Sequence, residues 1–223
     1  MKVWLLQANE PMPIVNEGQR LFRTGLIAEE LVKREHNVTW FATTFNHFEK
    51  KQMYDKDKDI KVEDNYELKL IWAPKYKRNI SVKRIINHKY MAVRLRKIIR
   101  KMEKPDIIYV SFPTIEFAEE AVKYGEKHNI PVIVDIRDLW PDIFNHNISK
   151  FKRIIAWPYI KLMQIKTKKI MKKAYAINGI SDKVVEWGLK KAGRNKNETD
   201  KGFLMGYEKA ENVNMKKVKR SKH

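Results

Sequence analysis

Apolar residues along the chain follow two alternating patterns: short continuous runs, and longer segments with helical spacing. The continuous runs are Lys2–Ala8, Asn37–Ala42, Asp106–Ser111, Pro131–Asp135 and Ala174–Asn178. Such runs are typical of strands that are buried on both faces. Between them the spacing predicts helices at Glu17–Arg34, Ser81–Glu103, Thr114–His128, Ser149–Lys173 and Ser181–Ala192.

This alternation predicts one α/β domain, a Rossmann-like parallel sheet with helices on both faces. Shorter strands are expected at Ile60–Val62, Glu67–Trp72 and Gly202–Met205. Asn46–Asp59 is polar and is expected to be a loop, and Pro158 predicts a kink or a break in the fourth helix. We assign residues 1–207 to this domain and residues 208–223 to a basic tail.

The charge balance of the chain indicates what kind of partner it binds. The chain has 47 Lys and Arg residues against 27 Asp and Glu, a net charge of +20. Such a charge favours a polyanionic partner, which leaves nucleic acid, an anionic lipid surface and phosphorylated substrates open. Cysteine is absent, which excludes disulfides and thiolate metal sites. No stretch approaches the roughly 18 apolar residues that span a bilayer, so the protein is expected to lie on a membrane without crossing it.

Most of the excess positive charge falls in two segments. Lys69–Lys104 holds thirteen Lys and Arg residues and one Glu, and Ile143–Ser181 holds nine with no acidic residue. Aromatic residues are interleaved in both. Nucleic-acid binding, membrane-surface binding and a solvated helix face each fit this pattern. The shortage of acidic residues favours an anionic partner over the solvated face.

Ligands of parallel α/β sheets bind beyond the carboxyl ends of the strands, so the loops there are candidates. The first loop lacks G-x-G-x-x-G, which argues against an NAD or FAD site. Gly18 and Arg20 remain candidates for holding one phosphate or sugar, or form an ordinary helix start. His47 follows the second strand and is a candidate acid or base, or an incidental loop histidine. No cluster has metal-ligand spacing.

The segment DIRDLWPD, Asp135–Asp142, directly follows a buried strand and concentrates charged residues. Asp138 is a candidate to take a proton from a sugar hydroxyl. Arg137 is a candidate to hold a phosphate through a bidentate pair. Asp135 is expected to be structural. The alternative is an Asp–Arg pair that ties the loop down, with Trp140 as a packing residue.

Six blocks of the chain occur in an order that resembles a known family. They are GQR at Gly18–Arg20, TFNHF at Thr44–Phe48, RIIN at Arg84–Asn87, KPDIIYVSFP at Lys104–Pro113, PVIVDIRDLWPD at Pro131–Asp142 and AYAINGISDKVVEWGLKKAGR at Ala174–Arg194. Together they resemble the N-terminal domain of family-4 glycosyltransferases of the GT-B fold. The nearest likeness is to bacterial N-acetyl-L-fucosamine transferase-like proteins of polysaccharide synthesis.

The resemblance implies two Rossmann-like domains, of which the N-terminal one binds the acceptor and the C-terminal one binds the nucleotide sugar. It implies hexosyl transfer with retention, without a cofactor or an obligatory metal, onto glycan acceptors that are often lipid-linked. Gly18 and Arg20 would lie near the donor phosphates. His47, Arg84, Arg137 and Asp138 would border the acceptor pocket.

We therefore expect the acceptor half of a glycosyltransferase, cytoplasmic and peripheral at the inner face of the plasma membrane. The glutamate motif for the donor is absent from the sequence, so a missing or separate C-terminal domain is expected, and this chain alone is expected to bind a nucleotide sugar poorly. Three readings stay open: a truncated product, one half of a split enzyme whose partner chain carries the other domain, and a domain kept for binding alone. A large exposed apolar patch beside the crevice would favour such a partner. The alternatives are a basic nucleic-acid-binding module, for which no zinc-finger or RNP motif occurs, and a non-catalytic lectin-like relic.

Overall fold

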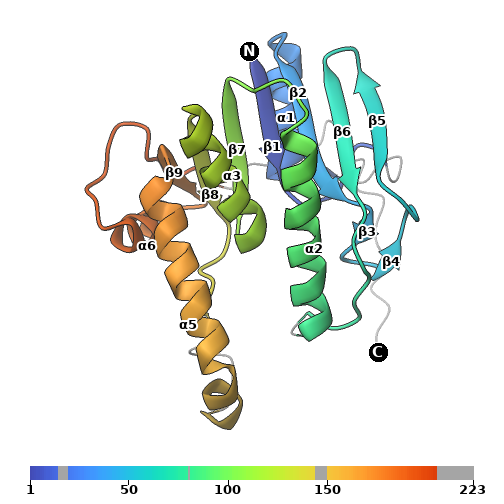
Figure 1. The fold of residues 1–223 in the computed structure, drawn as a ribbon. Coiled ribbons are helices and arrows are strands. Elements are labelled where there is room, and N and C mark those ends of the chain that lie inside the picture. The colour runs from blue at the N-terminus through green and yellow to red at the C-terminus, as the bar shows by residue number, and fades with distance from the viewer. Residues whose placement is uncertain (15–19, 80, 144–149, 205–223) are drawn as a thin grey trace, which may run out of the picture.

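The computed structural model describes residues 1–14, 20–79, 81–143 and 150–204 of the chain (Figure 1). The strands are β1 (Lys2–Leu6), β2 (Asn37–Thr43), β3 (Phe45–Asn46), β4 (Lys51–Gln52), β5 (Lys58–Glu63), β6 (Tyr66–Ile71), β7 (Ile107–Phe112), β8 (Val132–Ile136) and β9 (Ala176–Gly179). The helices are α1 (Arg23–Lys33), α2 (Val82–Ile99), α3 (Ile115–His128), α5 (Lys150–Lys173) and α6 (Asp182–Ala192). This is the α/β class that the sequence predicts.

The main sheet has seven strands in the order β5-β6-β2-β1-β7-β8-β9. Every neighbouring pair from β6 to β9 is parallel, as predicted, but β5 pairs antiparallel with β6. The tight turn at Asp64 and Asn65 explains this difference, because parallel neighbours need a much longer crossover. A separate hairpin of β3 and β4 forms in the predicted loop Asn46–Asp59. It begins one residue before that loop, at Phe45.

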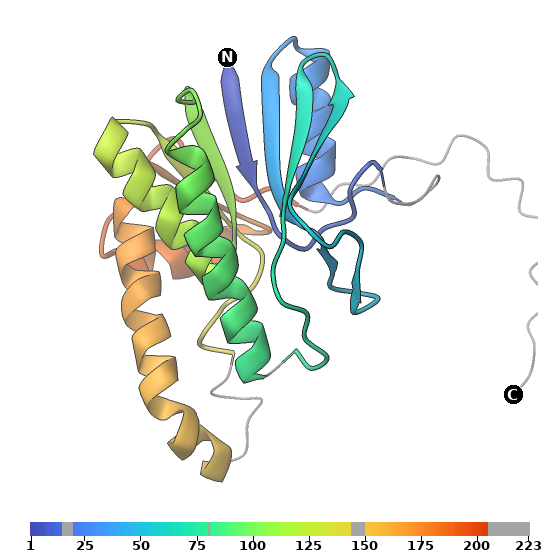
Figure 2. The ribbon, with the colours of Figure 1, turned by 45° about the vertical axis from the view of Figure 1, so that its right-hand side comes forward.

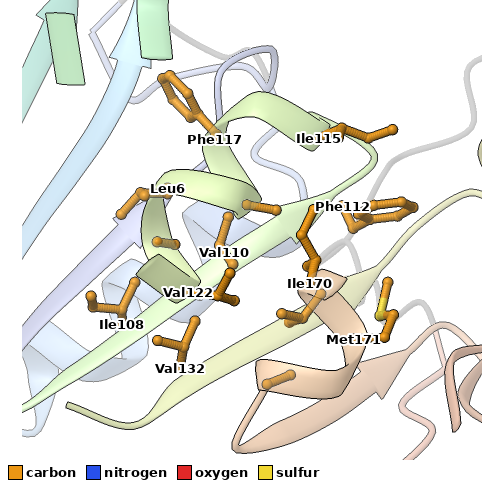
Figure 3. Close-up of a cluster of buried hydrophobic side chains, with 14 of the residues drawn as sticks. Leu6, Ile108, Val110, Phe112, Ile115, Phe117, Val122, Val132, Ile170 and Met171 are labelled. Atoms are coloured by element: carbon orange, nitrogen blue, oxygen red, sulfur yellow. The ribbon is translucent and has the colours of Figure 1, made fainter. Parts of the chain in front are cut away.

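Helices cover both faces of the sheet, but unequally. Residues of β1 alternate between two cores, with Trp4 and Leu6 in one and Val3 and Leu5 in the other. The first core is closed by α2, α3, α5 and α6, and the second by α1. Figure 2 shows α1 on one side of the sheet and α2, α3 and α5 on the other. Figure 3 shows side chains of the first core gathered between the sheet and its helices.

Three elements differ from the sequence prediction. Helix α1 begins at Arg23 rather than Glu17, because residues 20–22 are not helical; residues 17–19 lie outside the described part. The amide of Thr24 in its first turn donates to the Glu10 carboxylate at 2.9 Å. Helix α5 continues through Pro158 and is not split. Gly202 makes a single parallel bridge to Gly179 in place of a last strand.

A membrane-spanning helix is not found among the residues that the structure describes. The same residues contain no group of His, Asp and Glu side chains arranged to hold a metal ion. Residues 208–223, assigned to a basic tail, lie outside the described part.

Candidate active site

The carboxyl ends of the parallel strands meet at one edge of the sheet, toward which β1 points in Figure 2. The segments that follow β1, β2, β6 and β8 leave the sheet at this edge, because parallel strands all end on the same side. They carry Glu10, His47, Tyr76 and Asp138. The topology therefore gathers residues that are far apart in the sequence.

Arg137 lies at the centre of a buried network beneath this edge. Its guanidinium donates to Glu10 Oε1 at 2.7 Å and to the carboxylate of Asp135. It also lies 3.3 Å from the hydroxyl oxygens of Thr24 and Ser111. Asp135 is completely buried, as its expected structural role requires. The network matches the alternative that the sequence left open, an Asp–Arg pair that fixes the loop.

A second arginine completes the charge balance of this network. Arg23 NH2 lies 3.3 Å from Asp135 Oδ1, and Arg23 NH1 donates to the carbonyl oxygen of Phe203 at 2.7 Å. Two guanidinium groups thus face the two carboxylates of Glu10 and Asp135. Buried charges need such pairing, because an unpaired charge inside a protein is strongly destabilising.

His47 lies in the β3–β4 hairpin, where it is partly buried. Its Nδ1 is 2.5 Å from the hydroxyl oxygen of Tyr76 and 3.4 Å from Lys50 Nζ. An ammonium group can only donate, so Nδ1 is the acceptor and the ring proton belongs on Nε2. Burial, together with the positive charges of Lys50 and Arg84, lowers the pKa of His47 to about 4. His47 is therefore a neutral hydrogen-bond donor at neutral pH.

Arg84 lies in the first turn of α2, near His47. The amide of Arg84 donates to the N-cap hydroxyl of Ser81 at 3.3 Å, which fixes the start of the helix. The Arg84 guanidinium donates to the carbonyl oxygen of Asn79 at 2.9 Å, and Lys50 Nζ donates to the side chain of the same Asn79 at 2.6 Å. Asn79 thus links the surroundings of His47 to Arg84.

The loop after β8 brings an aromatic ring to Arg84. The Arg84 guanidinium carbon lies 5.2 Å from the centre of the Trp140 ring, a cation–π arrangement. Together with His88 and Tyr159 they line a hollow of about 60 Å³ between α2 and α5. Trp140 is partly buried and packs against the first core, as the packing alternative expects.

Asp138 and Asp142 lie in the same loop but differ in their partners. Asp142 accepts from the indole N–H of Trp187 at 3.0 Å and pairs with Lys191 at 2.7 Å, which ties the loop to α6. Asp138 Oδ1 accepts the amide of Leu139 at 2.8 Å. Within the described residues, Asp138 Oδ2 has no hydrogen-bond partner in the protein.

Of the two predicted donor-side residues, the structure describes only Arg20. Gly18 lies outside the described residues. Arg20 is exposed and lines a groove of about 830 Å³ that runs along α1. Phe22, Phe203 and Leu204 also line it and are 41%, 47% and 84% exposed. The structure therefore brings His47 and Arg84 together and puts Arg137 in the buried network. Arg20 lines the groove along α1, which is also lined by Arg23 of that network.

Four site residues were not singled out from the sequence. Glu10, Tyr76 and Asn79 lie in segments that follow strands of the sheet, and Lys50 lies in the β3–β4 hairpin. The position of Glu10 directly after β1 was a usable signal, because that loop faces the crevice. The pairing of Tyr76 with His47 had no signal in the sequence, since it depends on how the hairpin folds back.

Comparison with known proteins agrees with this fold. A sequence profile described as Glycosyltransferase Family 4 matches residues 24–198, more than half of the chain. Alpha,alpha-trehalose 6-phosphate synthase from Burkholderia multivorans has a similar structure, with a TM-score of 0.52 and 13% identity over 89% of this chain and 44% of that one. The apo UGT2 of Phytolacca americana matches with a TM-score of 0.45 and 10% identity, over 91% of this chain and 50% of that one.

No curated protein matches the sequence. The chain spans about half the length of the two solved structures. The likeness to the trehalose 6-phosphate synthase concerns the fold. The family match covers the segments that carry His47, Arg84, Arg137 and Asp138. The fold is one half of a GT-B arrangement, and the chain belongs to glycosyltransferase family 4.

Proposed function

We propose that this chain is the acceptor-side half of a glycosyltransferase that moves a sugar from a nucleotide-sugar donor to a lipid-linked glycan in cell-surface polysaccharide synthesis. The observation that carries the proposal is the loop after β8 in a family-4 chain. It presents Asp138 at the carboxyl edge of the sheet and holds Trp140 against Arg84.

In this proposal Asp138 takes the proton from the acceptor hydroxyl as that oxygen bonds to the sugar carbon. The bond from this carbon to the nucleotide phosphate oxygen breaks, and the nucleotide leaves with that oxygen from the same face, so the configuration is retained. Asp138 Oδ1 is held by the amide of Leu139, and Oδ2 is the oxygen left to accept a proton. A positioned carboxylate contributes to catalysis in this way when it lies within hydrogen-bond reach of the reacting hydroxyl.

His47 and Arg84 bind the acceptor in this proposal. Neutral His47 donates from Nε2 to an acceptor oxygen and does not act as the base, because its pKa is lowered to about 4. Arg84 supplies positive charge for a phosphate of a lipid-linked acceptor, and the Trp140 ring beside it offers an apolar surface to a sugar. Arg137 supports the loop from beneath.

The rest of the reaction belongs to a second domain in this proposal. That domain, on a longer chain or on a partner chain, binds the nucleotide sugar, and Arg20 contacts the donor from this side. Transfer proceeds with retention and needs no bound cofactor or metal. The exposed apolar groove along α1 supports a missing partner surface, because monomeric proteins rarely leave such a surface uncovered.

A lipid-linked acceptor would also account for the positive charge of the chain, because such an acceptor lies in a membrane. We propose that the protein acts in the cytoplasm at the inner face of the plasma membrane, where anionic lipids attract a chain with a net charge of +20. No specific nucleic-acid partner is required.

The proposal is tested by replacing Asp138 with Asn in a polypeptide, or pair of polypeptides, that carries both halves. We expect transfer of labelled sugar to detergent-dispersed lipid-linked acceptor to fall by about 100-fold or more, since general bases contribute on the order of 10²–10⁴. The thermal unfolding midpoint should stay near that of the wild type, because the Asp138 side chain forms a single local hydrogen bond among the residues that the structure describes.

Asp142→Asn is the matched control in the same loop. It weakens the tie to Trp187 and Lys191, so we expect a lower unfolding midpoint with transfer retained below that midpoint. Full transfer activity in Asp138→Asn would show that Asp138 is not the general base.

A further inference from the structure

Helix α2 carries two apolar stripes on opposite sides. The inner stripe is buried and includes Met91, Leu95 and Ile99. The outer stripe faces solvent, and its members recur at helical spacing. They are Val82 (70% exposed), Ile86 (49%), Tyr90 (38%) and Val93 (46%). Two stripes explain why the apolar residues of this helix fit one helical face only loosely.

Helix α5 repeats this arrangement. Its inner side chains Met163 and Ile170 are buried in the core. On its outer side Trp157, Leu162 and Ile165 are 61%, 47% and 45% exposed. Exposed single apolar residues are ordinary, but two helices on the same side of the sheet that each present a row of them indicate an interaction surface.

Lysine and arginine side chains surround both outer stripes. The exposed cations are Lys83, Lys89, Lys97 and Arg100 on α2 and Lys161, Lys168, Lys169 and Lys172 on α5. No ion pair involves any of these eight side chains in the described part of the chain. The cations on the sides that face α3 are neutralised there, since Arg96, Lys166 and Lys173 pair with glutamates of α3.

The two outer stripes flank the candidate acceptor site. Helices α2 and α5 lie on the same side of the sheet, and their amino-terminal halves extend past its lower edge (Figure 1). The hollow lined by Arg84, Trp140 and Tyr159 lies between them. Four of the seven exposed apolar side chains belong to these same halves: Val82, Ile86, Tyr90 and Trp157. The other three follow in the second halves of the two helices.

We propose that the outer faces of α2 and α5 form a docking surface for an anionic membrane leaflet. The aliphatic and aromatic side chains enter the headgroup region, and the flanking lysines bind lipid phosphates, as amphipathic helices do in the plane of an interface. Docking sets the hollow beside Arg84 against the leaflet from which a lipid-linked acceptor comes. The identity of the acceptor as a lipid-linked molecule rests on the proposed function. The docking of α2 and α5 on the membrane does not.

The test is sedimentation of the chain with vesicles of phosphatidylcholine mixed with phosphatidylglycerol, and with phosphatidylcholine alone. Two variants remove the two contributions separately: Val82→Ser/Ile86→Ser/Val93→Ser and Lys83→Gln/Lys89→Gln. Their matched controls lie away from the proposed surface. They are Tyr175→Ser, at a side chain 59% exposed, and Lys33→Gln/Lys201→Gln, at exposed positions on α1 and beyond β9.

We expect the wild type to bind anionic vesicles and to bind neutral ones weakly. Loss of the two lysines should weaken binding about tenfold or more at low salt, since each cation near the leaflet is worth about a fivefold change. Loss of the apolar stripe should weaken binding about tenfold and remove the binding that resists salt. Both controls should bind as the wild type does.

The proposal would be overturned if the wild type did not bind anionic vesicles, or if the apolar-stripe variant and the lysine variant both bound them as well as the wild type does. Displacement by duplex DNA, with DNA binding that also needs the lysines but not the apolar stripe, would instead identify a nucleic-acid surface. Vesicle binding uses no donor and no acceptor sugar, whereas transfer by Asp138 is measured with detergent-dispersed acceptor. Failure of one is therefore distinguishable from failure of the other.

Discussion

At the scale of single residues, His47 shows how surroundings change the chemistry of a side chain. Free histidine is a natural acid or base near neutral pH. Here burial and the nearby charges of Lys50 and Arg84 lower its pKa to about 4, and Tyr76 occupies its Nδ1. The residue type suggested proton transfer, but the environment favours hydrogen-bond donation by a neutral ring.

We expect the His47 ring to titrate near pH 4 in the folded protein, as measured by the pH dependence of its ring-proton NMR signals. Lys50→Gln should raise this pKa, because it removes a nearby positive charge. The unfolded chain binds a proton at His47 near pH 6.5, so this residue should make stability fall as the pH drops from about 6.5 to about 4. A titration near 6.5 in the wild type would contradict the neutral-donor role.

At the scale of elements, α3 holds two basic helices together. Arg96 of α2 donates to both carboxylate oxygens of Glu120, at 2.6 and 2.5 Å. Lys166 and Lys173 of α5 pair with glutamates of the same α3. A single acidic helix therefore lets two helices of like charge flank it on one side of the sheet.

We expect Glu120→Gln to lower the free energy of unfolding by about 2 kcal/mol, because it weakens a charged, bidentate hydrogen bond whose carboxylate is 5% exposed. Glu126→Gln is the control on the same helix. Its partner Lys173 and Glu126 itself are 36% and 59% exposed, so the loss should stay below about 1 kcal/mol. Urea unfolding measures both, and equal losses would mean that α3 does not brace α2 through Glu120.

At the scale of the whole molecule, the Arg137 network joins segments that are far apart in the chain. Arg137 follows β8, Glu10 follows β1, Thr24 lies in the first turn of α1 and Ser111 lies in the last part of β7. One guanidinium thus fixes the first loop, the start of α1 and the loop that carries Asp138 relative to one another.

We expect Arg137→Met to lower the free energy of unfolding by about 3–5 kcal/mol, because it strips a paired cation from buried carboxylates. Arg137→Lys keeps the positive charge but cannot reach all the oxygens. It should therefore lower the free energy of unfolding by less than Arg137→Met does. Arg34→Met, in an exposed pair with Glu30, should lose less than about 1 kcal/mol. Near-normal stability of Arg137→Met with weakened acceptor binding would instead identify Arg137 as a substrate-binding residue.

The groove along α1 belongs to the same scale. Only α1 among the described helices covers the second face of the sheet, and the exposed Phe203 and Leu204 border the groove beside it. The chain spans 44% of the trehalose 6-phosphate synthase chain that it resembles. In the proposed function, a second domain covers this groove.

Local patterns in the sequence predicted most of the strands and helices and the general position of the site. Continuous apolar runs predicted β1, β2, β7, β8 and β9, because a strand buried on both faces has no room for alternation. The rule that parallel strands end at one edge pointed to His47 and to the DIRDLWPD loop. Local patterns suffice for these, since neighbours along the chain set them.

Contacts between segments that are far apart in the sequence could be identified only from the folded structure. Glu10 reaches Arg137 across 127 positions, and Tyr76 reaches His47 across 29. The second apolar stripe of α2 was visible as residues, but whether it faces core or solvent depended on where α3 and the sheet lie. Burial, pairing and pKa are properties of the assembled surroundings, so the roles of Arg137, His47 and α2 became readable only in the folded chain.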